Sequence, residues 1–294
     1  MSVPFLTLRR AAVIEGIALH CGERVTVRLV PSQSCGLIFA RTDLPGAPEI
    51  AATFSSITHT THATTLAHNG VRLATTEHLL AALWMNGITH CRIEVDGGEI
   101  PILDGSAREW QSLIEDAGLQ ETGGARPITA LREPIWVGDG AAGILGLPHP
   151  ALRVSVAVDY GRDYLAPQIF DATLSTDTWR SEIAPARTFT LEEWIAPLRA
   201  AGLIRGGGED NAIVLRAERP SSPLRFPNEL ARHKALDVLG DMALLCGENG
   251  AVLGAHFVAV RAGHELHRRW MEDALQRGAF DFVPQNDVFE KKMR

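Results

Sequence analysis

Hydrophobic and polar residues alternate in several short stretches, a period of two that predicts half-buried strands. In the first half, residues 24–30 (RVTVRLV) and 89–95 (THCRIEV) alternate in this way. Strand-like runs recur near residues 130–137 and 152–159, and the apolar run 251–260 (AVLGAHFVAV) is also typical of a strand. We therefore expect strands in both halves of the chain.

Helical patterns lie between these strands. Residues 75–83 (TTEHLLAAL) begin with threonines that can cap a helix. Residues 106–117 (SAREWQSLIEDA) are amphipathic, with a serine at the start and Gly118 just past the end. A long helix is expected over 228–246 and another over 264–277.

Both halves thus begin with strands and end in helix–strand–helix, a similarity of element order rather than of residue identity. The pattern predicts an α+β fold of two related domains, each with strands on one side and helices on the other. We place the domains at 1–120 and 129–294, joined by a linker at 121–128 that includes ETGGARP. An extra section at about 184–216 suits a ligand channel or lid.

The composition narrows the class of protein. The chain has 294 residues, 46% of them hydrophobic and 21% charged, which are ordinary globular values. A formal net charge of −7 disfavours a nucleic-acid partner. The four cysteines show no CxxC spacing, and no stretch is typical of a leader peptide or an integral membrane segment. We therefore expect a cytoplasmic protein, with peripheral membrane association left open.

A first candidate for chemistry lies in the long helix of the second half. His233 and Asp237 are four residues apart, so both side chains lie on one face and could reach one zinc ion. Asp241 lies one turn further along the same face. Taken alone this spacing is weak, because most such pairs are solvated or only stabilise a helix.

A second candidate is the pair Glu77-His78, in the first turn of the helix at 75–83. The carboxylate could simply stabilise the helix dipole, and His78 could be a core histidine. However, each half places a histidine on its first long helix. If the domains pack face to face, His78, His233 and Asp237 would give three ligands and leave a fourth position to water, as in catalytic zinc sites. Glu77 could then act as the base.

Three further residues are weaker candidates. His264 opens a helix after Gly263, where its cationic form needs a carboxylate such as Asp241; a surface cap is an equal alternative. Lys234 should point about 100° away from the ligand face, as a solvated lysine would. Thr188 could donate a hydroxyl to an oxyanion, or could be a simple turn residue. The other histidines show no ligand spacing, and most are expected to be structural: His20, His59, His62, His68, His90, His149, His256 and His267.

Five motifs in order extend this picture. The runs ATTEHLLAAL, EIPILDGSA, ARTF, RHKALDVLGDMALL and GHELH, at these separations, resemble the UDP-3-O-acyl-N-acetylglucosamine deacetylases. GIALHCGERV and RTDLPG add to the similarity, which covers nearly the whole chain. The resemblance implies removal of acetate from the nitrogen of a UDP-linked, O3-acylated glucosamine, the committed step of lipid A biosynthesis.

The resemblance also implies an architecture and a cofactor. Two related β-α-α-β domains would form a two-layer sandwich with the active site and one zinc ion between them. Apart from the resemblance, we expect a monomer. Iron(II) could replace zinc in a site of two histidines and an aspartate. A deacetylase of another N-acetylated sugar, and a non-enzymatic binding protein on the same fold, remain alternatives.

Motif by motif, the resemblance assigns roles. His78, His233 and Asp237 correspond to the zinc ligands, Glu77 to the general base and His264 to the general acid. In the same way, Asp241 would orient that acid, Thr188 would assist at the oxyanion, Lys234 would contact the substrate phosphate, Phe189 would wall the sugar pocket, and His20 would contact substrate. The section at about 190–215 would be the acyl passage. Glu209, His62 and Ala63 depart from the expected pattern and leave the acyl length open.

Overall fold

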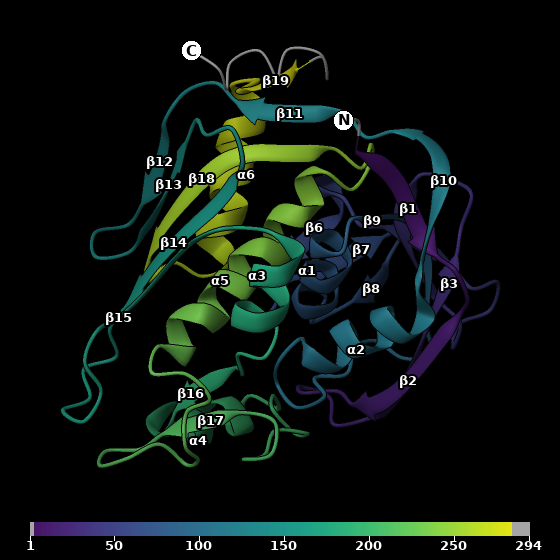
Figure 1. The fold of residues 1–294 in the computed structure, drawn as a ribbon. Helices are drawn as coiled ribbons and strands as arrows, with labels where there is room; N and C mark the ends of the chain where they lie inside the picture. The colour runs from purple at the N-terminus through teal and green to yellow at the C-terminus, as the bar shows by residue number, and fades with distance from the viewer. Residues whose placement is uncertain (1–2, 284–294) are drawn as a thin grey trace.

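The computed structural model describes residues 3–283 and has an α+β fold, which confirms the predicted class (Figure 1). The last part of the expected C-terminal domain, residues 284–294, lies outside the described residues. The described chain contains two seven-stranded sheets and two smaller ones. None of its helices is long and apolar enough to cross a membrane.

The first large sheet is built around β9, which is parallel to β1 and β4 and antiparallel to β3. The path β10-β1-β9-β3-β2 forms most of the sheet, and β4, which pairs with β9 off this path, also pairs with β5. Its strands are β1 Pro4–Leu8, β2 Ala12–Ile17, β3 Arg24–Pro31, β4 Gly36–Arg41, β5 Glu49–Ala51, β9 Ile88–Val95 and β10 Leu119–Ala125.

The second large sheet has the same organisation around β18, which is parallel to β11 and β14 and antiparallel to β13. Its path is β19-β11-β18-β13-β12, with β15 pairing with β14. Its strands are β11 Ile128–Leu131, β12 Ile135–Gly138, β13 Gly143–Leu147, β14 Leu152–Val158, β15 Gln168–Thr173, β18 Val252–Val260 and β19 Phe280–Val283. Each strand of one sheet therefore has a counterpart in the other, and we call these halves the first and second unit.

Much of the segment expected as a linker lies in a strand, while the division of the chain into domains stays a prediction. Residues 119–125 form β10, which pairs antiparallel with β1, and β11 begins three residues later. Gly123 and Gly124 have positive φ angles of 87° and 78°, so the edge strand is irregular. The glycines indicated a flexible connection, but β10 holds the place in the first unit that β19 holds in the second.

Four helices lie against the large sheets. In the first unit, α1 (Glu77–Met85) contacts β9 and α2 (Arg108–Ala117) contacts β2. In the second unit, α5 (Glu229–Met242) contacts β14 and β15, and α6 (His264–Gln276) contacts β12 and β13. The helices α1 and α5 pack against each other in the middle of the molecule, between the two sheets (Figure 1).

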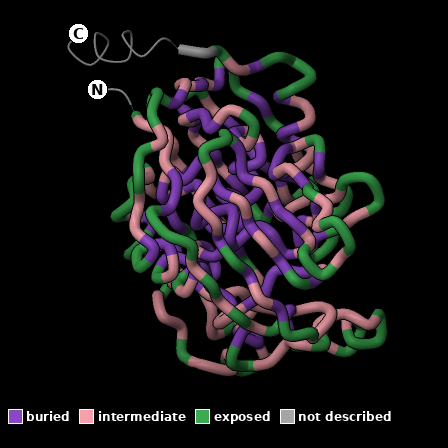
Figure 2. The backbone as a smooth tube through the Cα atoms, turned by 90° about the vertical axis from the view of Figure 1, so that its right-hand side faces the viewer, coloured by how far each residue is buried: buried purple, intermediate pink, exposed green. Residues whose placement is uncertain are grey.

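The contact between α1 and α5 depends on a glycine. A Cβ atom at Gly240 would lie 2.1 Å from the backbone oxygen of Glu77, so only glycine allows this approach. Nearly all of α5 is buried, and buried residues fill the interior of the molecule (Figure 2). The two helices that carry the candidate ligands are therefore held in close contact inside the core.

Each unit carries an insertion between its fifth strand and its first long helix. In the first unit this is a three-stranded sheet of β6 (Ile57–His59), β7 (Thr65–His68) and β8 (Val71–Leu73), which the sequence patterns did not predict. In the second unit, α3 (Thr176–Thr178) is followed by the expected extra section, which contains the parallel pair β16 and β17 and the short helix between them. Their bounds are β16 Phe189–Leu191, α4 Glu192–Ala200 and β17 Ile213–Leu215.

Candidate metal centre and its cavity

The contact between α1 and α5 brings His78, His233 and Asp237 together. One donor atom from each lies within 4.8 Å of the other two, and all three residues are buried. Asp237 Oδ1 is 3.4 Å from His233 Nε2 and 3.9 Å from His78 Nε2. The structure thus unites the three residues expected as ligands, one from the first unit and two from the second.

The spacing of these donors suits a metal ion. The separations exceed the ~2.8 Å of a charged hydrogen bond, whereas two ligands of one tetrahedral zinc ion lie roughly 3.3 Å apart. Burial lowers the pKa of His78 to about 3 and also lowers the pKa of His233, so both rings stay neutral at pH 7. Burial alone would raise the pKa of Asp237, but the neighbouring cations, Lys234 foremost, hold it below its usual range. Neutral imidazoles and an ionised carboxylate are the forms that bind metal.

Helix geometry predicted that Lys234 points away from the ligand face, and this prediction is wrong. Its Nζ donates a hydrogen bond to Asp237 Oδ2 at 2.7 Å, and its side chain is only 23% exposed. The ammonium also lies 5.5 Å from the centre of the Phe189 ring. Although burial opposes its charge, the Asp237 carboxylate raises the pKa of Lys234. The long, flexible stem lets the ammonium follow that charge across about 100° of helix.

A second group of polar residues lies one turn further along α5. Asp241 Oδ2 accepts hydrogen bonds from Nδ1 of His264 and Nδ1 of His267, each at 2.7 Å. Its Oδ1 accepts a hydrogen bond from Thr64 Oγ1 at 2.5 Å. Burial would raise the pKa of Asp241, but His264 and these hydrogen bonds lower it to about 2. Asp241 is therefore an ionised carboxylate at the centre of a hydrogen-bonded network.

Glu77 and His264 face each other beside the candidate ligands. Glu77 Oε1 is 3.9 Å from His264 Nε2, while its Oε2 accepts a hydrogen bond from Thr64 N at 3.1 Å. Burial raises the pKa of Glu77 to about 7. Burial alone would lower the pKa of His264, but Asp241 raises it to about 10. At neutral pH the pair can thus supply both a proton acceptor and a proton donor.

These groups open onto one cavity of about 430 Å³. Glu77, His264 and the three candidate ligands line it, while Asp241 lies behind His264 and does not. The remaining candidates from the sequence also line it: Thr188, Phe189, Lys234 and His20.

Comparisons with known proteins agree with the motifs. A family model described as "LpxC: UDP-3-O-acyl N-acetylglycosamine deacetylase" matches residues 6–276. The chain belongs to this family. A protein of Nostoc sp. named UDP-3-O-acyl-N-acetylglucosamine deacetylase is 39% identical over 268 residues, covering 89% of this chain and 94% of the relative. Proteins with the same name from Thermosynechococcus vestitus and Myxococcus xanthus are 40% and 36% identical, over 89% and 95% of this chain and 90% and 88% of their own lengths.

The second-unit insertion of this family member supplies apolar cavity walls together with charged groups. Ile195 and Leu198 of α4 line the cavity. Glu209, one of the departures, also lines it and pairs with Arg216. His62, another departure, lines the cavity from the first-unit insertion with a positive φ of 65°. Ala63, the third departure, is buried.

His20 is placed by its backbone. Its N–H donates to Glu99 Oε1 at 2.9 Å, and Cys21 N and Thr75 Oγ1 also donate to that buried carboxylate. Both ring nitrogens of His20 are buried without a hydrogen-bond partner among the described residues. His20 therefore presents an imidazole without a hydrogen-bond partner among the described residues to the cavity, although sequence spacing grouped it with histidines expected to be mostly structural.

Sequence reasoning missed three residues that support the site: Thr64, Glu99 and His267. Glu99 lies inside the motif EIPILDGSA, and His267 is one helical turn after His264 in GHELH, so both had a local signal. Thr64 had none, because only the fold brings it to Asp241, 177 residues away in sequence.

Proposed function

We propose that this protein removes acetate from UDP-3-O-acyl-N-acetylglucosamine and releases UDP-3-O-acyl-glucosamine, as the committed step of lipid A biosynthesis. The observation that carries the proposal is the convergence of three metal-type donors with Glu77 and His264 in one cavity. The names of the relatives support the choice of substrate. We expect the protein to act as a monomer in the cytoplasm.

We infer that zinc is held by His78, His233 and Asp237, and iron(II) is an alternative because the same donors suit it. When bound, zinc supplies Lewis-acid chemistry: it makes water more acidic and polarises a carbonyl. The protein's part is to keep both imidazoles neutral and the carboxylate ionised, which the buried environment favours.

The proton transfers fall to Glu77 and His264. Glu77 accepts a proton from the water whose oxygen bonds to the acetyl carbon, and a pKa of about 7 leaves the carboxylate partly ionised at neutral pH. The carbon–nitrogen bond then breaks, and His264 donates a proton from Nε2 to the leaving nitrogen. Asp241 keeps His264 cationic by accepting a hydrogen bond from its Nδ1. Thr188, whose N–H is fixed on Gly105 O at 2.7 Å, would stabilise the oxyanion through its hydroxyl.

The cavity also suggests how substrate would be held. Lys234 uses one ammonium hydrogen on Asp237 and has two others for a phosphate. Phe189 would form the wall of the sugar pocket, and His20 would donate or accept a hydrogen bond from its unsatisfied ring. The apolar side chains of α4 would receive the acyl chain.

The proposal is tested by acetate release from UDP-3-O-acyl-N-acetylglucosamine and from the sugar without the acyl chain, with metal content measured on the same sample. We expect release that depends on one zinc ion per chain and on the acyl group. Glu77→Gln should lower kcat by about 10²- to 10⁴-fold and leave zinc bound. Equal rates on both sugars would favour a deacetylase of another N-acetylated sugar, and full activity after complete metal removal would overturn the proposal.

A further inference from the structure

The polar face of α5 begins one turn earlier than the candidate site. Glu229, His233, Asp237 and Asp241 follow one another at intervals of four residues, and all four are buried. The last three belong to the two groups described above. Glu229 does not line the cavity, and nothing in the proposed mechanism uses it.

Glu229 is fully buried and yet has donors for both of its oxygens. Its Oε1 accepts hydrogen bonds from Arg187 N at 3.0 Å and Arg187 Nε at 2.9 Å. Its Oε2 accepts from Arg187 Nη2 at 3.1 Å and from Arg225 N at 2.5 Å. A carboxylate bound on both oxygens fixes the backbone of Arg187 as well as its side chain.

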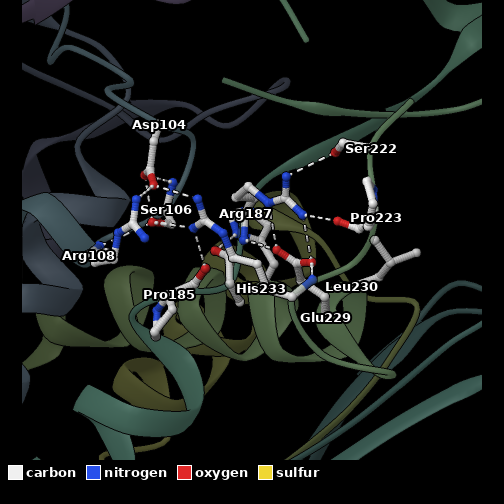
Figure 3. A network of polar contacts seen from close by, with 12 residues as sticks. Asp104, Ser106, Arg108, Pro185, Arg187, Ser222, Pro223, Glu229, Leu230 and His233 are labelled. Carbon is white, nitrogen blue, oxygen red and sulfur yellow. Dashed lines mark hydrogen bonds and ion pairs between the residues drawn. The ribbon is translucent and has the colours of Figure 1, made fainter. Parts of the chain in front are cut away.

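The guanidinium of Arg187 is held on its other side too. Its Nη1 donates to Ser222 Oγ at 3.0 Å and its Nη2 to Pro223 O at 2.8 Å, as Figure 3 shows. The residue just before it, Ala186, accepts a hydrogen bond on its carbonyl oxygen from His233 Nδ1 at 3.0 Å. Consecutive residues of one segment therefore contact residues one turn apart on α5: Arg187 contacts Glu229, and Ala186 contacts His233.

The geometry points to Arg187 and Glu229 as positioning residues for the metal ligand His233, acting through the Ala186 carbonyl; this rests on the proposed metal site. A carbonyl that accepts from Nδ1 keeps the proton there and turns Nε2 toward Asp237, 3.4 Å away. The Ala186 carbonyl and Arg187 N belong to one peptide group, and Glu229 accepts a hydrogen bond from that N–H. The Arg187–Glu229 pair therefore fixes the carbonyl that sets the direction of the ring. His78 Nδ1 is buried without such a partner among the described residues, so a backbone carbonyl orients the ring of His233 but not that of His78.

The same segment is also tied to the first unit. Arg225 Nη1 donates to Pro185 O at 2.7 Å, and its Nη2 donates to Asp104 Oδ2 at 2.9 Å (Figure 3 shows both acceptors). Thr188 N donates to Gly105 O at 2.7 Å. The backbone that orients His233 is thus bonded to both units, so loss of the Arg187–Glu229 pair should disturb the ligand more than the fold.

Arg187→Met is the test, with Arg232→Met as the matched control. Both arginines are largely buried (12% and 14% exposed side chains) and both pair with a glutamate, but Arg232 bonds Glu182 and Asn228 rather than the glutamate that holds the Ala186–Arg187 peptide. Zinc affinity is measured by competition with a chelator, together with the visible spectrum of the cobalt(II) form and the Tm of the metal-free protein. We expect Arg187→Met to bind zinc about 10- to 100-fold more weakly and to change the cobalt spectrum. Arg232→Met should match the wild type in both.

Glu229→Gln, which keeps the shape of the side chain, should give the same loss of affinity if Arg187→Met does not fold. The double variant of Arg187→Met and Glu229→Gln should bind zinc no more weakly than the single variant with the lower affinity, since both substitutions remove the same ion pair. If the wild type binds zinc and Arg187→Met, Glu229→Gln and Arg232→Met all bind it with the same affinity as the wild type, this inference alone is overturned. Absence of zinc binding in the wild type would overturn the proposed function as well.

Discussion

Two groups of two histidines and one aspartate lie one turn apart along α5, and they differ in how their polar atoms are satisfied. In the first, Asp237 lies 3.4 and 3.9 Å from His233 and His78. In the second, Asp241 lies 2.7 Å from both His264 and His267. In both groups the three donor atoms lie within 4.8 Å of one another, but in the second both histidines donate hydrogen bonds to the aspartate. Residue types alone therefore do not distinguish the two groups; the distances between their donor atoms do.

The electrostatics of the two groups differ accordingly. Burial leaves His78 with a pKa of about 3, whereas Asp241 raises the pKa of His264 to about 10. A neutral imidazole is a ligand, and an imidazolium is a proton donor. In each group the carboxylate's second oxygen has its own donor, Lys234 for Asp237 and Thr64 for Asp241.

The largest expected effect separates the two groups directly. His233→Ala should lower zinc affinity by more than the ~100-fold typical of losing an outer partner, because it removes a ligand itself. His267→Ala should keep one zinc ion per chain, since it removes only a hydrogen bond to Asp241. Metal content after dialysis and the Tm of each metal-free variant provide the measurement. A loss of zinc in both variants would break the distinction.

A smaller effect concerns the proton donor. Asp241→Asn removes the charge that raises the pKa of His264, so that pKa should fall from about 10. His264 is protonated below its pKa, so activity that needs this proton is lost as pH rises through it. In the variant the alkaline loss of kcat/KM should therefore begin at a lower pH, with zinc still bound. An alkaline limb at the same pH as in the wild type would show that Asp241 does not tune His264.

The stability linked to His264 has the same sign. Because the pKa of His264 in the folded protein lies above the ordinary 6.5 and that of Asp241 lies below the ordinary 3.8, the pair stabilises the fold fully between those two values. This contribution is lost as pH rises through about 10. In Asp241→Asn, the difference in Tm from the wild type should therefore shrink toward high pH.

The smallest expected effect is on the contact that places both groups. Gly240→Ala puts a methyl group against Glu77 O and should destabilise the protein by about 1–3 kcal/mol. Gly98→Ala is the control, since its nearest neighbours lie at an ordinary 3.8 Å and its φ is not in the left-handed region. Denaturant unfolding of both variants measures the difference. An unchanged stability in Gly240→Ala would mean that the two helices can separate without cost.

The local part of this site could be predicted from the sequence. His233 and Asp237 share a helix face by spacing alone, and Glu77-His78 opens a helix where the sequence predicted one. The predicted threonine cap is wrong, because Thr76 makes no side-chain capping bond and its hydroxyl donates to Thr64 O instead. The same spacing extended backwards would have reached Glu229. Lys234 was misplaced because a helical wheel gives the direction of Cβ, whereas the ammonium lies four carbons further and follows charge.

The rest depended on tertiary structure. The glycines of β10 indicated a linker because strand pairing with β1 is not visible in local composition. The small sheet β6–β8 was missed because its strands have only three or four residues each. The partners of Asp241 come from a first-unit insertion and from α6, so no spacing along the chain could have placed them together.

The matching topology of the two units has a consequence for how the molecule holds together. The first unit supplies one of the three candidate metal ligands and the second unit supplies two, so neither unit alone contains the complete metal site. An ion bound there would link the two units through its ligands. Its binding free energy would also stabilise the association of the two units. Removing the ion would therefore destabilise the interface between α1 and α5 before it destabilised either sheet.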